Sequence, residues 1–322
     1  MKRLEAIDLL TLTLRRKHLA LSTEETYRYW LVQYLDSLAT VNPTLPSEKK
    51  IERFLTGLAL RDYSASSQNQ AFNALLFFYR DCLGQELQRI NALRAKKPIT
   101  IRNAPSVAEV RALLAAVEDA SGYPTRLIVK LLYGCGLRVN EPLNLRIRDV
   151  LLNDSQLIIR AAKGGKDRVV ALPCSLVGEI QAQLELSRII HQRDRAAGIP
   201  VQLPGRVEQK YPAAQFSRQW AFVFPMAAPC RHPRTGQIVR YRVLDCNVQR
   251  AIQRACRKLD LEIKPHELRH AYATHTLNAG INPRAIQAAL GHKSLETTMG
   301  YLHAAAVSVP SPLETIILCP PQ

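Results

Sequence analysis

The stretch HELRH, residues 266–270, contains side chains that could do two different chemistries. Its letters match the zinc-hydrolase pattern H-E-x-x-H, in which two histidines four residues apart bind Zn²⁺ and the glutamate is the general base. The same letters contain H-x-x-R, which places His266 and Arg269 on one side of a helix. A histidine and an arginine so placed suit the binding of a phosphate group without a metal.

Four other short stretches offer reactive side chains. GCGLRVNEPL places Arg138 after a glycine-broken helix, with Glu141 three residues further on. AAKGGKDR places Lys163 at the tip of a turn between two strands. ALGHKS places His292 just after a glycine that is a typical helix C-cap, and TTMGYLH offers Tyr301. Each of these alone could be structural, as an ion pair, a capping histidine or a core tyrosine.

The elements that must position these side chains are mainly helices. Residues 1–92 predict a compact module of four helices, in which Trp30 and Tyr34 recur at helical spacing and belong to the core. Ser22 with Glu25 predicts a capping box at the start of one of these helices.

A basic stretch with two prolines and no helical period, 93–105, predicts a linker that follows a phosphate backbone. The second domain, 106–322, begins with a capping box formed by Ser106 and Glu109.

Within the second domain, residues 155–173 alternate like two strands around a Gly-Gly turn. The chain from Cys174 onward is again mainly helical, apart from an irregular stretch at 199–243. The predicted fold class is therefore mainly α with a small antiparallel β-sheet.

Composition indicates a polyanionic partner. The chain of 322 residues has 44 Lys and Arg against 27 Asp and Glu, a net charge of +17 that is spread along the sequence. Such an excess usually serves nucleic acid binding. No stretch of about 18 apolar residues predicts a membrane span, and the first residues do not read as a signal peptide. The seven cysteines form no C-x-x-C pair, which indicates reduced thiols in a cytoplasmic protein.

The order of the reactive groups is more informative than any one of them. It resembles that of the tyrosine recombinase (phage-type integrase) family across essentially the whole chain: Arg138, Lys163, His266 with Arg269, His292 and Tyr301. The helical module at 1–92 is similar to the SAM-like core-binding domain of that family, and 106–322 to its catalytic domain.

The resemblance implies a reaction on a DNA phosphodiester. Arg138 and Arg269 would hold the two non-bridging oxygens and stabilise the negative charge that develops on phosphorus. Tyr301 would be the nucleophile that forms a 3′-phosphotyrosine, and Lys163 would protonate the departing 5′-oxygen.

The remaining groups would assist that reaction. His266 and His292 would handle the tyrosine proton and hydrogen-bond the phosphate, while Glu141 would orient the site and His270 would brace it. The bond energy is kept in the phosphotyrosine, so the resemblance implies no metal and no cofactor. It also implies a tetramer on double-stranded recombination sites.

The long span before His266 resembles that of the integron integrases, whose insert recognises bases extruded from folded single-stranded cassette sites. The insert near 199–243 has Trp220 and Pro233 at matching places. Where the family carries two histidines, this chain has Tyr241 and Arg242, which could stack on a base and hold a phosphate.

A second departure from the family is Pro142, directly after Glu141. Proline fits only the first turn of a helix, so Asn140 is expected to cap a helix there.

Several alternatives stay open. Another tyrosine recombinase, from a phage or transposon or one that resolves chromosome dimers, would share all the catalytic groups. A type IB topoisomerase would use the same site as a monomer, and a DNA-binding protein with a decayed site would bind without reacting. A zinc hydrolase would need a third ligand, and the extended metzincin pattern fails at Ala273 and Thr276.

Overall fold

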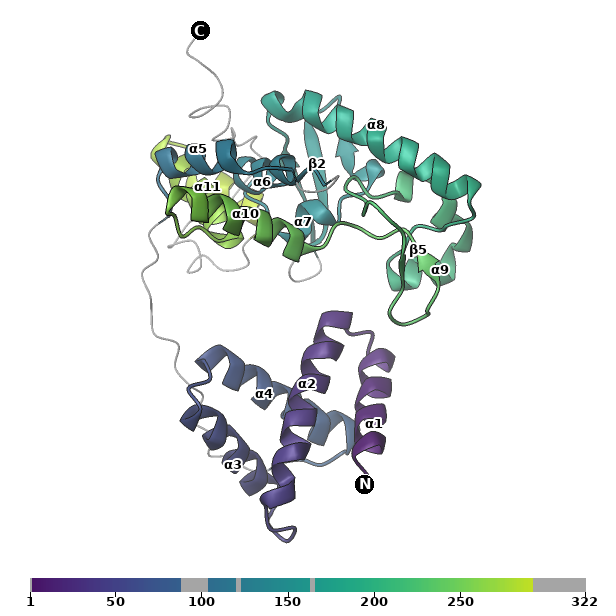
Figure 1. The fold of residues 1–322 in the computed structure, drawn as a ribbon, viewed down its shortest axis with the longest axis vertical. Coiled ribbons are helices and arrows are strands. Elements are labelled where there is room, and N and C mark those ends of the chain that lie inside the picture. Colours follow the sequence, from purple (N-terminus) through teal and green to yellow (C-terminus); the bar gives the residue numbers. More distant parts are fainter. Residues whose placement is uncertain (1, 88–103, 120–122, 163–165, 292–322) are drawn as a thin grey trace. The chain divides into compact units, whose positions relative to one another are not determined.

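The structure is a computed structural model that describes residues 2–87, 104–119, 123–162 and 166–291 (Figure 1). The chain packs as two units, 1–101 and 102–322. Of the predicted linker, 93–105, only Ala104 and Pro105 lie among the described residues.

The first unit is helical, as predicted. Its apolar side chains recur at helical spacing and meet in one core, to which Trp30, Tyr34 and Leu75 each contribute. The hydroxyl groups of Tyr34 and Tyr79 lie 2.8 Å apart, so each buried phenol has a polar partner. The helices are α1 (Arg3–Arg16), α2 (Leu21–Ser37), α3 (Ser47–Leu60) and α4 (Ala65–Phe77), which runs on into a wider π turn, Phe78–Cys82.

The capping box predicted for α2 is wrong. The helix begins at Leu21, so Ser22 already lies inside its first turn and no side chain caps it. Glu24, in the same turn, is buried and accepts hydrogen bonds from Arg15 of α1. The helix is therefore held by a contact between helices, which local sequence patterns do not reveal.

The second unit combines helices with a small sheet, and this confirms the predicted fold class. Its core includes residues of both kinds of element, such as Leu132, Leu157 and Ile252. Ser106 and Glu109 form the predicted capping box. The helices are α5 (Val107–Ala116), α6 (Thr125–Gly134), α7 (Asn140–Leu143), α8 (Cys174–Ala196), α9 (Gly205–Lys210), α10 (Asp245–Leu259), α11 (Pro265–Asn278) and α12 (Pro283–Leu290).

The sheet is antiparallel, with strand order β1 (Val150–Leu151), β2 (Gln156–Ala162) and β3 (Lys166–Ala171). Alternation places Leu157 and Ile159 of β2 in the core, opposite Val170 and Arg168 of β3. An arginine thus occupies a position on the inward face of β3, and this position matters for the site described below.

Residues 199–243 are irregular, as predicted, and pack against α8. They contain α9, short 3₁₀ turns and a small hairpin of β4 (Cys230–Arg231) and β5 (Ile238–Val239). Ser187 and Gln183 of α8 donate hydrogen bonds to the carbonyl oxygens of Phe222 and Val223. Figure 1 shows α8 running along the second unit toward α9 and β5.

A buried ion pair completes the attachment of this stretch. Arg240 donates from Nε and Nη2 to the two carboxylate oxygens of Asp194 on α8, each at 2.6 Å, and from Nη1 to the carbonyl of Met226. Both side chains are almost fully buried. Within the described residues, no helix has the length and apolar character that a bilayer crossing requires.

Asp194→Asn should lower the free energy of unfolding of this unit by about 3–5 kcal/mol, because the Arg240 charge would stay buried without its counter-charge. Urea unfolding measures it. The fluorescence of Trp220 in a Trp30→Phe background reports on this unit alone, because the chain has 2 tryptophans. Glu185→Gln, also on α8, removes an exposed ion pair with Arg188 and should have almost no effect. Equal effects of the two substitutions would contradict the role of the buried pair.

Candidate active site

The carboxylate of Glu141 is the centre of a cluster of three arginines. Arg138 donates to it twice, from its backbone nitrogen at 2.8 Å and from Nη1 at 2.9 Å. The side chain of Arg138 is 26% exposed, so its guanidinium faces solvent in part while Glu141 fixes its direction. The predicted relation between Arg138 and Glu141 is therefore a direct contact.

The helix that carries Glu141 begins differently from the prediction. Pro142 is tolerated in the first turn of α7, as expected, but Asn140 is the first helical residue and does not cap it. Its Oδ1 instead accepts a hydrogen bond of 3.0 Å from Nη2 of Arg242. This contact joins the 199–243 stretch to the element that holds Glu141.

The second arginine is Arg168 of β3, which the sequence analysis missed. It donates from Nη1 and Nη2 to the two oxygens of Glu141, at 2.9 and 2.6 Å. Its Nε donates to the carbonyl of Ala289, at the end of α12, at 2.7 Å. The pattern that would have revealed Arg168 is its place on the inward face of an alternating strand, where a charge needs a partner.

The third arginine, Arg269 of α11, is only 2% exposed. It donates from Nη1 to the carbonyl of Gly136 at 2.7 Å and from Nη2 to the carbonyl of Leu290 at 2.5 Å. Nη1 also lies 3.9 Å from the Glu141 carboxylate. Arg269 thus connects the glycine loop before Arg138 to the end of α12.

Two glycines allow these close approaches. Gly136 has a φ of +60°, and a Cβ there would lie 2.6 Å from the ring of Tyr272. Gly291 has a φ of +64°, and a Cβ there would lie 3.0 Å from Cδ of Arg168. Gly291 is also the left-handed C-cap of α12, as predicted. The last turn of α12 therefore has its free carbonyl oxygens bonded by Arg168 and Arg269.

The electrostatics of the cluster follow from one carboxylate among three cations. Burial acts to raise the pKa of Glu141, but the hydrogen bonds and charge of Arg168, followed by those of Arg138, outweigh it and lower that pKa. Burial and the nearby charge of Arg138 lower the pKa of Arg269 to about 9. At neutral pH both Glu141 and Arg269 are consequently ionised.

The two histidines of HELRH lie on α11 beside Arg269 but toward its outer surface. His266 and His270 are exposed, and their rings pack edge to face with centroids 4.5 Å apart. One turn later, the buried His275 has its Nδ1 2.8 Å from the hydroxyl of Tyr133. Among the described residues, no three His, Cys, Asp or Glu side chains gather as metal ligands would.

The predicted residues of the insert do not form one cluster. Tyr241 is half-buried, with its ring edge against Phe222, and Arg242 lies 5.5 Å over that tyrosine ring. Trp220 packs instead against the guanidinium of Arg148, and Pro233 is exposed in the hairpin between β4 and β5.

Lys163, His292 and Tyr301 lie outside the described residues. Their neighbours are described: β2 ends at Ala162, directly before Lys163, and Gly291 directly precedes His292. Arg168, which lies opposite Ile159 of β2 in the strand register, bonds the end of α12.

Glu141→Gln should lower the free energy of unfolding at neutral pH by about 3 kcal/mol, because three guanidinium groups lose their shared anion. The pKa of Glu141 is lower in the folded than in the unfolded chain, so its ionised form stabilises the fold above the ordinary glutamate pKa. That contribution disappears as the pH falls through the folded-state pKa. Urea unfolding from neutral pH down to about pH 3 should therefore show the two proteins converging.

The exposed glutamate Glu262 in the same unit provides the control, and Glu262→Gln should leave the stability unchanged at each pH. A difference between wild type and Glu141→Gln that stays constant with pH would contradict an ionised Glu141.

Comparison with known proteins places this geometry in a family. Residues 106–307 match the phage integrase family, and residues 7–89 match the phage integrase N-terminal SAM-like domain. An integrase/recombinase of Escherichia coli is 34% identical, over 98% of this chain and 95% of that protein. The tyrosine recombinase XerA of Pyrococcus furiosus is 30% identical, over 88% of this chain and 84% of its own.

A solved structure, the Tn1549 transposon integrase in complex with transposon right end DNA, has a TM-score of 0.60 with this chain. The match covers 93% of this chain and 95% of the transposon integrase chain, at 16% sequence identity. An identity this low supports a shared fold only. The family match covers most of the sequence, and the relatives match nearly end to end. The chain therefore belongs to the phage integrase family of tyrosine recombinases and is a tyrosine-type DNA strand transferase.

Proposed function

We propose that this enzyme is a site-specific recombinase that cleaves and rejoins DNA strands through a 3′-phosphotyrosine at Tyr301. The observation that carries the proposal is the fixed arrangement of Arg138 and Arg269 around Glu141. The Arg138 guanidinium is partly exposed and already oriented by Glu141, while the buried Arg269 adds a fixed positive charge 3.9 Å from the same carboxylate. Such preorganised charge stabilises a pentacoordinate phosphorus.

The reaction is a transesterification in which every bond is accounted for. The Tyr301 oxygen attacks phosphorus, and its proton passes to His266 or His292. The bond to the 5′-oxygen breaks as Lys163 supplies the proton that this oxygen needs. Attack by a 5′-hydroxyl of the partner strand reverses these steps and releases the tyrosine. Arg168 holds Glu141, and His270 supports the His266 ring.

The partner is DNA, and this part of the proposal rests on charge and family. The net charge of +17 is the electrostatic footprint of a polyanion-binding protein. The related transposon integrase was solved with transposon DNA. Residues 1–92 and 106–322, joined by a basic linker at 93–105, would each bind the duplex. Four copies would assemble on two sites, in the cytoplasm, where such DNA is found.

Within the family, we assign the chain to the integron integrases. This finer assignment rests on the 199–243 insert, with Trp220 and Pro233 at matching places. Tyr241 and Arg242 depart from the pattern, because they stand where those enzymes carry two histidines. The alternative is a recombinase that resolves DNA dimers or moves a phage or transposon. The 30% identity to a XerA recombinase over 88% of this chain supports that alternative.

Tyr301→Phe should abolish a covalent protein–DNA band formed with a nicked suicide substrate in EDTA. The substitution removes the nucleophilic oxygen, and the wild-type reaction needs no metal. Denaturing gel electrophoresis detects the band. Tyr29→Phe, which changes an exposed tyrosine of the first unit, is the matched control and should keep it. A band that survives Tyr301→Phe, or a wild-type band that EDTA prevents, would overturn the mechanism.

Tyr241→Ala should reduce recombination of folded single-stranded cassette sites more than that of double-stranded sites. Loss of stacking on one extruded base is worth about 1–3 kcal/mol, or roughly 5- to 150-fold in affinity. Any loss of folding from the Phe222 contact affects both substrates equally, so the ratio of the two activities is its own control. An unchanged ratio would argue for the Xer-like or transposon alternative.

A further inference from the structure

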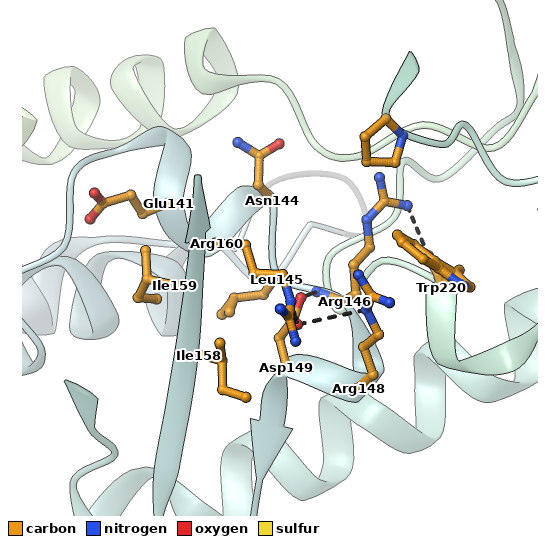
Figure 2. A pocket seen from close by; sticks show the side chains of 11 residues that line it. Glu141, Asn144, Leu145, Arg146, Arg148, Asp149, Ile158, Ile159, Arg160 and Trp220 are labelled. Carbon is orange, nitrogen blue, oxygen red and sulfur yellow. Dashed lines mark hydrogen bonds and ion pairs between the residues drawn. The ribbon is translucent and has the colours of Figure 1, made fainter. Parts of the chain in front are cut away.

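A second group of arginines surrounds a pocket beside Glu141. The pocket has a volume of about 190 Å³ and is lined by residues of α7, β2 and two short 3₁₀ turns (Figure 2). Small-molecule sites usually measure about 300–1,000 Å³, so this space fits a single chemical group rather than a whole cofactor.

Arg148 is the unusual residue of this pocket. Its guanidinium stacks on the ring of Trp220, with Cζ 3.4 Å from the ring centre. Its Nε is buried, yet within the described residues it has no hydrogen-bond partner. Leaving such a donor unpaired costs free energy, which an acceptor from outside the protein would recover.

The nearby carboxylate of Asp149 bonds other donors and lies too far from this one. Its Oδ1 accepts a hydrogen bond of 2.5 Å from Nε of Arg160, and its Oδ2 accepts one of 3.1 Å from the backbone of Arg146. Nε of Arg148 lies 3.8 Å from Oδ1, beyond hydrogen-bond length. The guanidinium is thus held in place by a ring and a charge, and its buried Nε has no hydrogen-bond partner in the described part of the chain.

The charge of the pocket favours an anion. Arg146, Arg148 and Arg160 line it against Asp149, while the carboxylate of Glu141, the other lining acid, is bonded by Arg138 and Arg168. Figure 2 shows the Glu141 carboxylate pointing away from the pair formed by Arg148 and Trp220. Burial lowers the pKa of the Arg148 guanidinium and outweighs the opposing charge of Asp149.

The geometry points to a binding site for one backbone phosphate of the DNA substrate, held by Arg148 on its Trp220 platform. This inference rests on the proposed function, because it takes DNA as the substrate. The 28% exposure of the Arg148 side chain leaves its edge open to the pocket, and the flat guanidinium can donate two parallel hydrogen bonds to a phosphate. Since the pocket shares Glu141 with the arginine cluster, the phosphate would lie on DNA passing that cluster.

This assignment gives Trp220 a different role from a base platform. The ring face that Arg148 covers at 3.4 Å is closed to a nucleobase. Trp220 therefore acts as a positioning residue that fixes the plane of Arg148. The two residues should then behave as one unit in DNA binding.

The test is the salt dependence of DNA affinity, measured by fluorescence anisotropy with a labelled duplex of about 30 base pairs. Arg148→Gln should lower the slope of log affinity against log salt by about 0.9, the value of one phosphate contact. Trp220→Leu should lower it by a similar amount, and the double variant by about 0.9 in total rather than about 1.8. Arg188→Gln removes an exposed arginine that already pairs with Glu185, and its slope should match that of wild type.

Three other outcomes would overturn the proposal. An Arg148→Gln slope equal to that of wild type would show that no phosphate is bound there. A Trp220→Leu protein with weaker binding but an unchanged slope would show that Trp220 stacks on a base. Inorganic phosphate at about 10 mM and constant ionic strength should leave wild-type affinity unchanged. If inorganic phosphate lowers the DNA affinity of wild type but not that of Arg148→Gln, the pocket binds a free phosphate ion instead.

The suicide-substrate assay separates failure of this inference from failure of the proposed function. If Arg148→Gln forms the Tyr301 adduct at low salt, the variant is folded, and a wild-type slope then refutes the phosphate site alone. If wild type forms no adduct and binds no duplex, the proposed function fails and the phosphate site fails with it.

Discussion

The catalytic unit depends on the contacts between the ionised carboxylate of Glu141 and three arginines. Arg138, Arg168 and Arg269 come from three separate parts of the chain, and their guanidinium groups would repel one another without it. The carboxylate brings the glycine loop, strand β3 and helix α11 to one point. Arg168 and Arg269 then use their remaining donors to bond the last carbonyl oxygens of α12. A single charge thus connects strand β3 and helix α11 to the end of α12, which directly precedes His292.

The same arrangement occurs a second time around Asp149. There, too, a buried carboxylate binds neighbouring donors, and one arginine is left with unspent hydrogen-bonding capacity. In the first cluster the most exposed arginine is Arg138, and in the second Arg148 is fixed on Trp220. In each case the guanidinium is oriented by the fold before any ligand binds, so binding does not have to supply the free energy of that ordering. This property is expected of a surface that binds a phosphate backbone.

Much of this could be predicted from the sequence, where the relevant pattern is local. Helical spacing located the core of the first unit, alternation located the β2–β3 hairpin, and Gly291 indicated the end of α12. Asn140 was predicted to cap α7, but its partner is Arg242, far along the chain, and no local pattern reveals such a contact. The inward position of Arg168 on an alternating strand was a local signal for a buried charge, but its partners, Glu141 and Ala289, could not be named from that pattern. The geometry of the site depends on polar contacts between residues far apart in the sequence, and only the folded structure shows which residues meet.

The central claim is that Arg138, oriented by Glu141, stabilises negative charge on the reacting phosphate. The direct test compares single-turnover cleavage of a normal scissile phosphodiester with that of a neutral methylphosphonate, using wild type and Arg138→Ala. Arg138 is suitable because its partly exposed side chain leaves the rest of the cluster in place. Arg138→Ala should lose about two to three orders of magnitude in rate on the phosphodiester, as for loss of one preorganised donor. It should regain most of that rate on the methylphosphonate. An equal deficit on both substrates would contradict the account.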